Sequence, residues 1–281
     1  MAVIIGIDVG GSTTKIAGIM DGEIKSPMFI TAADPVTSLF GAFGKYLYDN
    51  HIALTDIEQI MLTGVGSAYI KEPLYGCSTA KVDEFISNAL GAQYQSGLDR
   101  LIVVSMGTGT SFIRIENGVS KHIGGMCIGG GTLQGLSRLL LKSHDIHQVA
   151  ELAKIGDLSN IDLQIQDICN QPLPDLPLNA TASNFGKAES NAVEEDIAAG
   201  IVHMVLQTIG SAANLAGLST GIKDFVLIGN LTQLPQCRLI FESMEELYHI
   251  RFHIPPYAEY RTALGAALSY LQNEKSIIQL K

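Results

Sequence analysis

Two stretches of the sequence, residues 3–22 and 100–118, follow the same plan. The first reads VIIGIDVGGSTTKIAGIMDG and the second RLIVVSMGTGTSFIRIENG. Each contains an apolar strand, a turn of glycines and hydroxyl side chains, a second strand, and a hairpin turn, Asp21-Gly22 or Asn117-Gly118. Chance likeness between two hairpins is the alternative. We favour duplication of a domain, because internal similarity of this kind constrains the whole fold.

Apolar strands alternate with helical stretches along the chain, which is typical of an α/β fold. Besides the two hairpins, the sequence predicts strands at Ile57–Thr63, Asp224–Gly229 and Arg251–Ile254. It predicts helices from Asp34-Pro35 to about Asp49, from Ser78 to about Gln95, from about Thr132, and over Ile197–Leu218, Pro235–Tyr248 and Thr262–Leu271. Residues 160–187 contain three prolines and many polar residues, which predicts an irregular insertion.

The composition excludes several classes of protein. A net charge of −10 over 281 residues argues against sequence-independent nucleic-acid binding, although backbone N–H groups can still bind phosphate. The cysteines, Cys77, Cys127, Cys169 and Cys237, are widely separated, which favours reduced cytosolic thiols over disulfides or a zinc ribbon. We see no signal peptide, and polar side chains within 197–218 predict a buried or interface helix rather than a membrane span.

The first hairpin turn has the chemistry of a phosphate site. Its glycines let the backbone approach a ligand closely, and Ser12, Thr13 and Thr14 add hydroxyl groups. Asp8 is a candidate ligand for hydrated Mg²⁺. Lys15 is either a phosphate ligand or the polar face of an exposed strand. For this turn taken alone, an ordinary hairpin is the competing interpretation.

Two further glycine-rich segments carry similar chemistry. GTGTS, residues 107–111, repeats the first turn, and Gly129-Gly130-Gly131-Thr132 opens a helix whose N–H groups and dipole favour anions. Neither a Walker A loop nor a Rossmann fingerprint is present. Two glycine-hydroxyl hairpins that face one another therefore predict two lobes that grip the phosphates of ATP.

Phosphoryl transfer also needs a base for the accepting hydroxyl, and Asp83 and Glu84 are the candidates. Adjacent helical residues point about 100° apart, so one of the two acids should lie near the packed side. Solvent-facing acids are the competing interpretation for both. His144 and His147 are interpreted as surface or packing residues rather than metal ligands, and Cys127 as a packing residue rather than a nucleophile.

With these motifs in place, the chain resembles the type II pantothenate kinases of the actin/hexokinase/Hsp70-like ATPase superfamily. The resemblance rests on IGIDVGGSTTK, VDEF, SMGTGTS, IGGMCIGGGTLQGL, GDLSNIDLQIQDI, NATASNFGK, FVLIGN and RTALGAAL, nearly end to end. It implies two similar actin-like (ribonuclease H-like) lobes with mixed sheets and an ATP cleft between them, divided into residues 1–97 and 98–281. For the final helix, about 262–273, packing back on the first lobe is left open.

The resemblance also implies roles for individual residues. It makes Glu84 the catalytic base, and Asp8 would position the magnesium ion. The residues that it places at the nucleotide are Asp8, Val9, Gly10, Gly11, Ser12, Thr13, Thr14, Lys15, Thr108, Gly130, Gly131, Thr132, Leu133, Gln134 and Asn230. It further implies a homodimer, for which Ile197–Leu218 is a suitable interface helix.

One position departs from the family pattern. The family carries an arginine before the paired glycines that helps to bind pantothenate, whereas this chain has His122 there, with Lys121 beside it. Histidine is shorter and mostly neutral near neutral pH, so it is a poor substitute for a bidentate guanidinium at a carboxylate. Lys121 is a candidate to compensate.

Residues and resemblance together predict a cytoplasmic enzyme that uses ATP and Mg²⁺ to convert pantothenate to 4′-phosphopantothenate, the first step of coenzyme A biosynthesis. No nucleic-acid or membrane partner is expected. His122 motivates one alternative, a kinase of the same fold for another hydroxyl, such as a pantetheine-like amide or an amino sugar. A non-catalytic sensor of ATP or CoA thioesters is another. An iron–sulfur ATPase activator is not favoured, because no cysteine pair is placed to share a cluster.

Overall fold

The computed structural model describes residues 2–11, 13–31, 34–169, 171, 176–273 and 277–280. Its strands are β1 (Val3–Val9), β2 (Thr13–Met20), β3 (Glu23–Thr31), β4 (Ile57–Thr63), β5 (Thr79–Lys81), β6 (Leu101–Met106), β7 (Thr110–Glu116), β8 (Val119–Met126), β9 (Leu163–Gln164), β10 (Thr181–Ser183), β11 (Asp224–Ile228), β12 (Arg251–His253) and β13 (Ile278–Gln279). Its α-helices are α1 (Pro35–Asp49), α2 (Glu84–Gln93), α3 (Gly130–Leu140), α4 (Ile146–Ala153), α5 (Ile165–Ile168), α6 (Glu194–Leu218), α7 (Pro235–Tyr248) and α8 (Arg261–Leu271).

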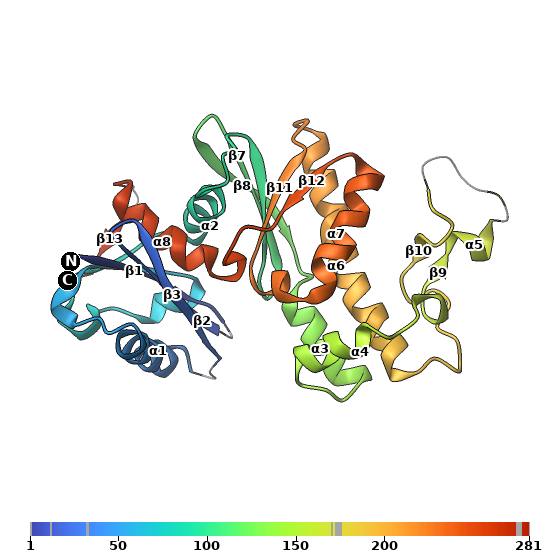
Figure 1. Cartoon of the computed structure of the whole chain (residues 1–281), viewed down its shortest axis with the longest axis horizontal. Coiled ribbons are helices and arrows are strands. Elements are labelled where there is room, and N and C mark those ends of the chain that lie inside the picture. Colours follow the sequence, from blue (N-terminus) through green and yellow to red (C-terminus); the bar gives the residue numbers. More distant parts are fainter. Residues whose placement is uncertain are drawn as a thin grey trace.

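Two mixed sheets lie side by side, with α2 and α8 between them (Figure 1). The first sheet has the order β13-β5-β4-β1-β2-β3 and the second has β12-β11-β6-β7-β8. In each, an antiparallel meander, β1-β2-β3 or β6-β7-β8, is extended in parallel by later strands, β4 and β5 or β11 and β12. The two similar sequence stretches therefore form equivalent parts of two similar sheets.

Both meanders turn at a dipeptide with a left-handed backbone. The φ angles are 53° and 80° at Asp21 and Gly22, and 53° and 72° at Asn117 and Gly118. Positive φ at both central residues gives the turn whose twist matches that of paired strands. The two predicted hairpin turns are confirmed.

Helix α2 begins later than the sequence predicts. The stretch expected to be helical from Ser78 instead contains β5, which pairs in parallel with β4. The helix starts at Glu84 because Asp83 caps it: the Asp83 carboxylate accepts hydrogen bonds from the backbone N–H groups of Phe85 (2.8 Å) and Ile86 (3.2 Å). A three-residue strand leaves too little periodicity to be distinguished from the helix that follows.

Other predicted bounds are close to those observed. The N-cap of α1 is confirmed, since the Asp34 carboxylate accepts a hydrogen bond from the backbone N–H of Thr37 at 2.6 Å. Helices α3 and α6 begin slightly earlier than expected, at Gly130 and Glu194. The predicted irregular insertion contains β9, α5 and β10, and its residues 170 and 172–175 lie outside the described residues.

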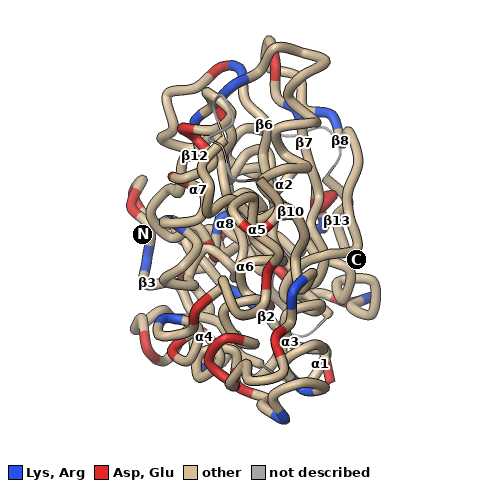
Figure 2. Tube along the Cα trace, turned by 90° about the vertical axis from the view of Figure 1, so that its right-hand side faces the viewer, with Lys and Arg blue, Asp and Glu red and all other residues tan. Residues whose placement is uncertain are grey.

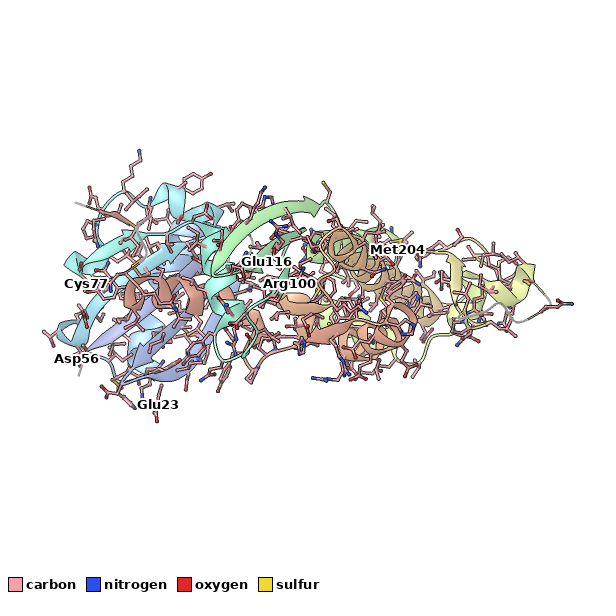
Figure 3. The ribbon with its side chains drawn as sticks, turned by 90° about the horizontal axis from the view of Figure 1, so that it is seen from above. Glu23, Asp56, Cys77, Arg100, Glu116 and Met204 are labelled. Atoms are coloured by element: carbon pink, nitrogen blue, oxygen red, sulfur yellow. The ribbon has the colours of Figure 1, made fainter. Side chains whose placement is uncertain are left out.

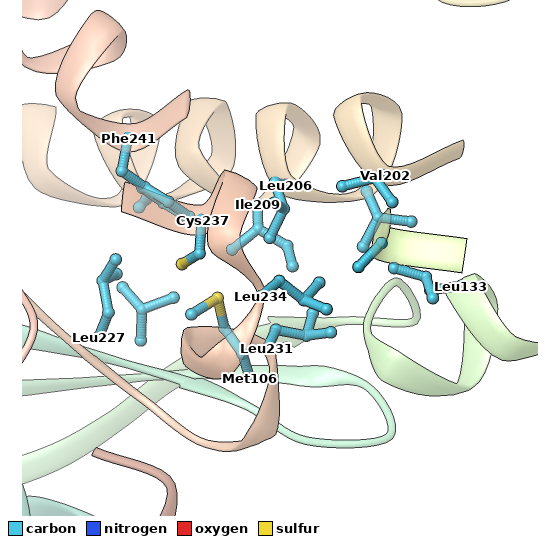
Figure 4. Close-up of a cluster of buried hydrophobic side chains, with 14 of the residues drawn as sticks. Met106, Leu133, Val202, Leu206, Ile209, Leu227, Leu231, Leu234, Cys237 and Phe241 are labelled. Carbon is cyan, nitrogen blue, oxygen red and sulfur yellow. The ribbon is translucent and has the colours of Figure 1, made fainter. Parts of the chain in front are cut away.

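Each sheet has its own hydrophobic core. In the first lobe, α1 packs against β1, β2 and β4 through Leu39 and Phe43. In the second, α6 and α7 cover β6 and β11, and their side chains meet those of the loop before α7 (Figure 4). The buried side chains labelled there are Met106, Leu133, Val202, Leu206, Ile209, Leu227, Leu231, Leu234, Cys237 and Phe241.

Helices α2 and α8 occupy the space between the lobes. Ala89 and Ala92 of α2 pack on β6, β7 and β11 of the second sheet. Ala263 and Ala267 of α8 pack on β1 and β2 of the first. The chain thus crosses between lobes twice, and α8 returns to the first sheet after the second lobe is built.

Seen from above, the two lobes and the insertion lie in a row (Figure 3). Arg100, just before β6, and Glu116, at the end of β7, point toward one another, and Nε lies 2.6 Å from Oε1. Figure 2 shows Lys and Arg scattered over several elements rather than gathered along one. Helix α6 is the only described helix long and apolar enough to cross a membrane, but 44% of that stretch is buried inside the protein, so it packs as part of the second lobe.

Candidate active site

Two charged side chains face one another at the end of the first hairpin. Asp8 on β1 pairs with Lys15 on β2, and the residues are 8% and 5% exposed. Burial raises the pKa of Asp8, and the charge of Lys15 opposes that shift. Burial lowers the pKa of Lys15, and the carboxylates of Asp8, Glu259 and Glu84 oppose it. Lys15 is therefore not the polar face of an exposed strand.

Glu84 joins this cluster from the first turn of α2. Burial raises its pKa to about 7; the charges of Asp8 and Asp83 add to the shift, and Lys15 reduces it. Asp83 is exposed and serves as the N-cap of the helix. The two adjacent acids therefore differ: Asp83 faces solvent, whereas Glu84 is half-buried and electrostatically coupled to Asp8 and Lys15.

Gly64 and Glu259 belong to the same neighbourhood, although the sequence analysis did not single them out. Gly64 has φ +83°, and a Cβ there would lie 2.4 Å from Oδ1 of Asp8. The absent side chain therefore keeps the space beside this carboxylate open. The TGVG run after β4 was a usable signal for Gly64. No local pattern connects Glu259, just before α8, with Lys15.

A second cluster forms where the β6–β7 turn meets the start of α3. The backbone N–H groups of Gly130 and Gly131 donate to the carbonyl oxygens of Gly107 (2.8 Å) and Thr108 (2.9 Å). A Cβ on Gly129 would lie 2.7 Å from the carbonyl oxygen of Thr108. Two of the N–H groups expected to attract an anion therefore form hydrogen bonds between the two glycine segments. Position 129 must be glycine, because the two backbones approach too closely there for a Cβ.

The other predicted nucleotide residues differ in exposure. The exposed ones are Gly11, Thr108 and Asn230; the half-buried ones are Gly10, Thr13, Gly130, Gly131, Thr132 and Gln134; the buried ones, besides Asp8 and Lys15, are Val9, Thr14 and Leu133. The side chains of Val9 and Leu133 belong to the two hydrophobic cores, which leaves only their backbones for a ligand. Ser12 lies outside the described residues.

His122 on β8 stacks on Phe85 of α2. Their ring centroids are 4.0 Å apart and the ring planes differ by 9°. Phe85 directly follows Glu84, so this contact brings β8 to the start of α2. Lys121 precedes His122 in a regular part of the strand, and successive side chains of a strand point to opposite faces. Lys121 is therefore directed away from the face that carries the His122–Phe85 stack.

The two described cavities lie elsewhere. The larger, of about 620 Å³, is lined by the insertion, by α6 and by α7, and includes His203 and Gln207. The smaller, of about 480 Å³, lies between the end of α7 and β12, beside Lys223 and Arg251. Neither includes a residue of the two clusters, which are defined by their charges and backbone contacts.

Comparison with known proteins identifies relatives of this chain. The model of the Fumble family matches residues 93–239. The type II pantothenate kinase of Bacillus cereus (strain G9842) is 30% identical over 241 residues, which cover 80% of this chain and 83% of that protein. The type II pantothenate kinase of Oceanobacillus iheyensis is 28% identical over 276 residues, covering 94% and 98% of the two chains.

Solved structures share the fold. Component A of (R)-2-hydroxyglutaryl-CoA dehydratase from Acidaminococcus fermentans has a TM-score of 0.69 at 23% identity, and the match covers 95% of this chain and 97% of that chain. The activator of 2-hydroxyisocaproyl-CoA dehydratase from Clostridium difficile, solved with bound ADPNP, has a TM-score of 0.69 at 17% identity, with 97% and 96% covered. The ROK hexokinase of Thermus thermophilus has a TM-score of 0.55 at 13% identity, with 97% and 100% covered. These likenesses confirm the predicted α/β fold of two lobes with mixed sheets.

Proposed function

The chain belongs to the Fumble family of type II pantothenate kinases, and from this premise we propose that it transfers the γ-phosphoryl group of ATP to the primary hydroxyl group of pantothenate. The product, 4′-phosphopantothenate, is the first intermediate on the route to coenzyme A. The observation that carries the proposal is the half-buried Glu84, electrostatically coupled to Asp8 and Lys15.

Glu84 is suited to act as the general base. A carboxyl group with a pKa of about 7 is substantially ionised at neutral pH and still accepts a proton more readily than an ordinary glutamate. In the proposed step, the pantothenate hydroxyl loses its proton to Glu84, its oxygen bonds to the γ-phosphorus, and the bond to the ADP oxygen breaks. Asp83 has no such role, because it is exposed and caps the helix.

Lys15 and the glycine turns would hold the phosphates. Lys15 carries the positive charge of the cluster, and a point charge of this kind suits phosphate oxygens. At the first turn, Gly11 is exposed, and the N–H of Gly10 donates to the carbonyl oxygen of Thr13 at 2.9 Å, which closes the turn. At the second turn, Thr108 is exposed, whereas Gly130 and Gly131 support the turn through their hydrogen bonds to it.

The residues around Asp8 fit a magnesium ion. Its carboxylate is a hard oxygen donor, and Gly64 leaves open the space that a Cβ would fill 2.4 Å from Oδ1. Among the described residues, no group of three His, Cys, Asp or Glu side chains could enclose a metal ion. A hydrated ion held by Asp8 and by phosphate oxygens is therefore the suitable form. When bound, Mg²⁺ would neutralise charge on the phosphates of ATP.

The direct experiment measures ADP release with ATP, Mg²⁺ and pantothenate for the wild type, Glu84→Gln and Asp83→Asn. Glu84→Gln should lower kcat by roughly 100-fold or more and leave ATP affinity nearly unchanged. Asp83→Asn is the matched control, since it removes the neighbouring charge and keeps a good N-cap. Full turnover by Glu84→Gln would disprove its role as the base.

A second candidate function is phosphorylation of another hydroxyl by the same machinery. It is favoured by His122, whose ring is held against Phe85 where the family carries an arginine. A panel of pantothenate, a pantetheine-like amide and an amino sugar in the ADP assay separates the two candidates. ADP release that no acceptor accelerates would instead favour a non-catalytic sensor.

We further propose a cytoplasmic homodimer in which α6 forms the interface. Its exposed Leu215 and Leu218 support this, since each is 67% exposed. We keep the division into 1–97 and 98–281 as a proposal. It is supported by the sheets, because β1–β5 lie before the boundary and β6–β8, β11 and β12 after it; α8 and β13 are the parts of 98–281 that join the first lobe.

A further inference from the structure

Arg261, at the start of α8, is 1% exposed and is the largest fully buried side chain among the described residues. Its Nε donates to the carbonyl oxygen of Pro256 at 3.0 Å. One terminal nitrogen donates to the carbonyl oxygens of Gly91 (3.1 Å) and Tyr94 (2.8 Å). Among the described residues, no carboxylate forms an ion pair with it. Since a buried cation is costly without partners, these carbonyl groups hold the guanidinium, together with the ring of Tyr94, whose centroid lies 5.7 Å from Cζ.

Two of the three carbonyl groups lie at the carboxyl end of α2, the helix that begins with Glu84. Unpaired carbonyl groups there carry the negative end of the helix dipole, which favours a cation. Arg261 thus holds one end of α2, and the Asp83 cap holds the other. A helix of this size is a short rod of about 15 Å, so a shift at its carboxyl end displaces Glu84.

The contact between α2 and α8 leaves no space for a side chain at Gly91 or Gly265. A Cβ on Gly91 would lie 1.8 Å from the carbonyl oxygen of Arg261, and a Cβ on Gly265 would lie 1.8 Å from that of Ser87. Between these contacts, Oγ1 of Thr262 donates to Oδ1 of Asn88 at 2.7 Å. Because the backbones touch and side chains form hydrogen bonds across the contact, the two helices are expected to move as one unit.

The opposite face of α8 contacts the first sheet just as closely. A Cβ on Gly6 of β1 would lie 1.8 Å from the carbonyl oxygen of Ala263. Gly6 shares its strand with Asp8, which pairs with Lys15. Helix α8 therefore acts as a spacer: one face fixes the strand that carries Asp8, and the other fixes the helix that carries Glu84.

We propose that Arg261 is a positioning residue for Glu84. It ties the carboxyl end of α2 to Pro256, in the segment that leads from the second sheet into α8, and so fixes Glu84 relative to Asp8 and Lys15. Its link to catalysis rests on the proposed function, because the role of Glu84 as the base belongs to that proposal. An arginine that merely stabilised the fold would leave the surroundings of Glu84 unchanged once the protein had folded.

The test titrates the Glu84 carboxyl group by NMR of ¹³C-glutamate protein, with its signal assigned by its loss in Glu84→Gln. Arg261→Met keeps side-chain volume and removes all donors; Arg261→Lys keeps one cationic donor. In Arg261→Met we expect the pKa of Glu84 to fall from about 7 toward the ordinary 4.5, because water reaches a displaced helix end. We expect kcat to fall by about tenfold or more, with KM for ATP changed less than about twofold, and Arg261→Lys to recover part of the loss.

The control is Phe241→Leu, which weakens the second-lobe core without touching α2. All variants are compared at a temperature where circular dichroism shows them folded. A wild-type titration in Arg261→Met, or an equal shift in Phe241→Leu, would overturn the proposal. If Arg261→Met does not fold, the titration of Glu84 is carried out on Arg261→Lys, with a shift in the same direction expected. If the titration shifts while the wild type does not phosphorylate pantothenate, the proposed function fails and the positioning role stands.

Discussion

Asp8 and Lys15 are direct neighbours across the β1–β2 pair, and both are almost completely withdrawn from water. Each charge therefore depends on the other for compensation. The balance is unequal, because Lys15 is also coupled to Glu84 and Glu259, so that three carboxyl groups share one cation. Burial first, and then the charges of Asp8 and Asp83, raise the pKa of Glu84 to about 7.

Lys15→Met tests this arrangement. Lys15 lowers the pKa of Glu84, so its removal should raise that pKa above about 7 and move the rise of kcat/KM to higher pH. At neutral pH, kcat/KM should fall by roughly 100-fold because a phosphate-binding charge is also lost. Lys25→Met on β3, where the lysine pairs only with Glu23, is the control. An unshifted pH profile would contradict the coupling.

Glu84 should also make stability depend on pH. Its pKa is about 7 in the folded state and 4.5 ordinarily, so between these values the folded state binds more protons than the unfolded state. Its contribution to the free energy of unfolding is therefore full below about 4.5 and is lost as pH rises through about 7. Urea unfolding should show Glu84→Gln gaining stability over the wild type near pH 8, with a smaller gain near pH 5. Equal gains at both would refute this.

Gly64→Ala should impair both stability and activity. The substitution places a Cβ 2.4 Å from Oδ1 of Asp8 at a residue with φ +83°. Gly22→Ala is a matched control, because Gly22 has φ +80° and nothing within 4 Å of its Cβ position. Both variants should lose about 1–3 kcal/mol of unfolding free energy from backbone strain, and Gly64→Ala more. Only Gly64→Ala should lose kcat; equal activity of the two would show that the space beside Asp8 is dispensable.

His122→Arg should lower KM for pantothenate by several-fold and leave KM for ATP unchanged. A guanidinium can stack on Phe85 in place of the imidazole and still offer a paired donor to a carboxylate. Lys121→Arg, on the opposite face of β8, should change neither constant. Steady-state kinetics with both substrates varied decides the matter. A rise in KM for pantothenate would mean that the imidazole itself is what the acceptor requires.

Much of this fold could be predicted from the sequence. The two hairpins end in dipeptides that favour left-handed turns, and Asp34-Pro35 marks a helix start, so local chemistry determines these elements. Strand β5 was missed because its three residues are specified by pairing with β4 rather than by their own pattern. Asp83 was placed inside a helix that it caps, since residues that begin a helix resemble those that continue it.

The residues of the candidate site could be predicted, but their burial, electrostatic coupling and hydrogen bonds could not. The glycine turns indicated Asp8 and Lys15 as candidates, whereas the choice of Glu84 over Asp83 came from the family resemblance. Burial of Lys15 depends on strands and helices that pack around it, and the contribution of Glu259 depends on a segment far along the chain. Nor could the sequence reveal that the N–H groups of Gly130 and Gly131 donate hydrogen bonds to the β6–β7 turn. Such properties arise only when distant segments meet.

The return of the chain to the first sheet affects how the protein matures during translation. Helix α8 covers β1, and β13 adds an antiparallel edge to β5, yet both are made after the whole second lobe. A nascent chain that has not reached Arg261 leaves Ile4, Ala17 and Ile19 without the helix that buries them. The first lobe therefore cannot finish folding as an independent domain before the second lobe is made. The apolar faces of β1 and β2 stay uncovered until the last helix, α8, has been made.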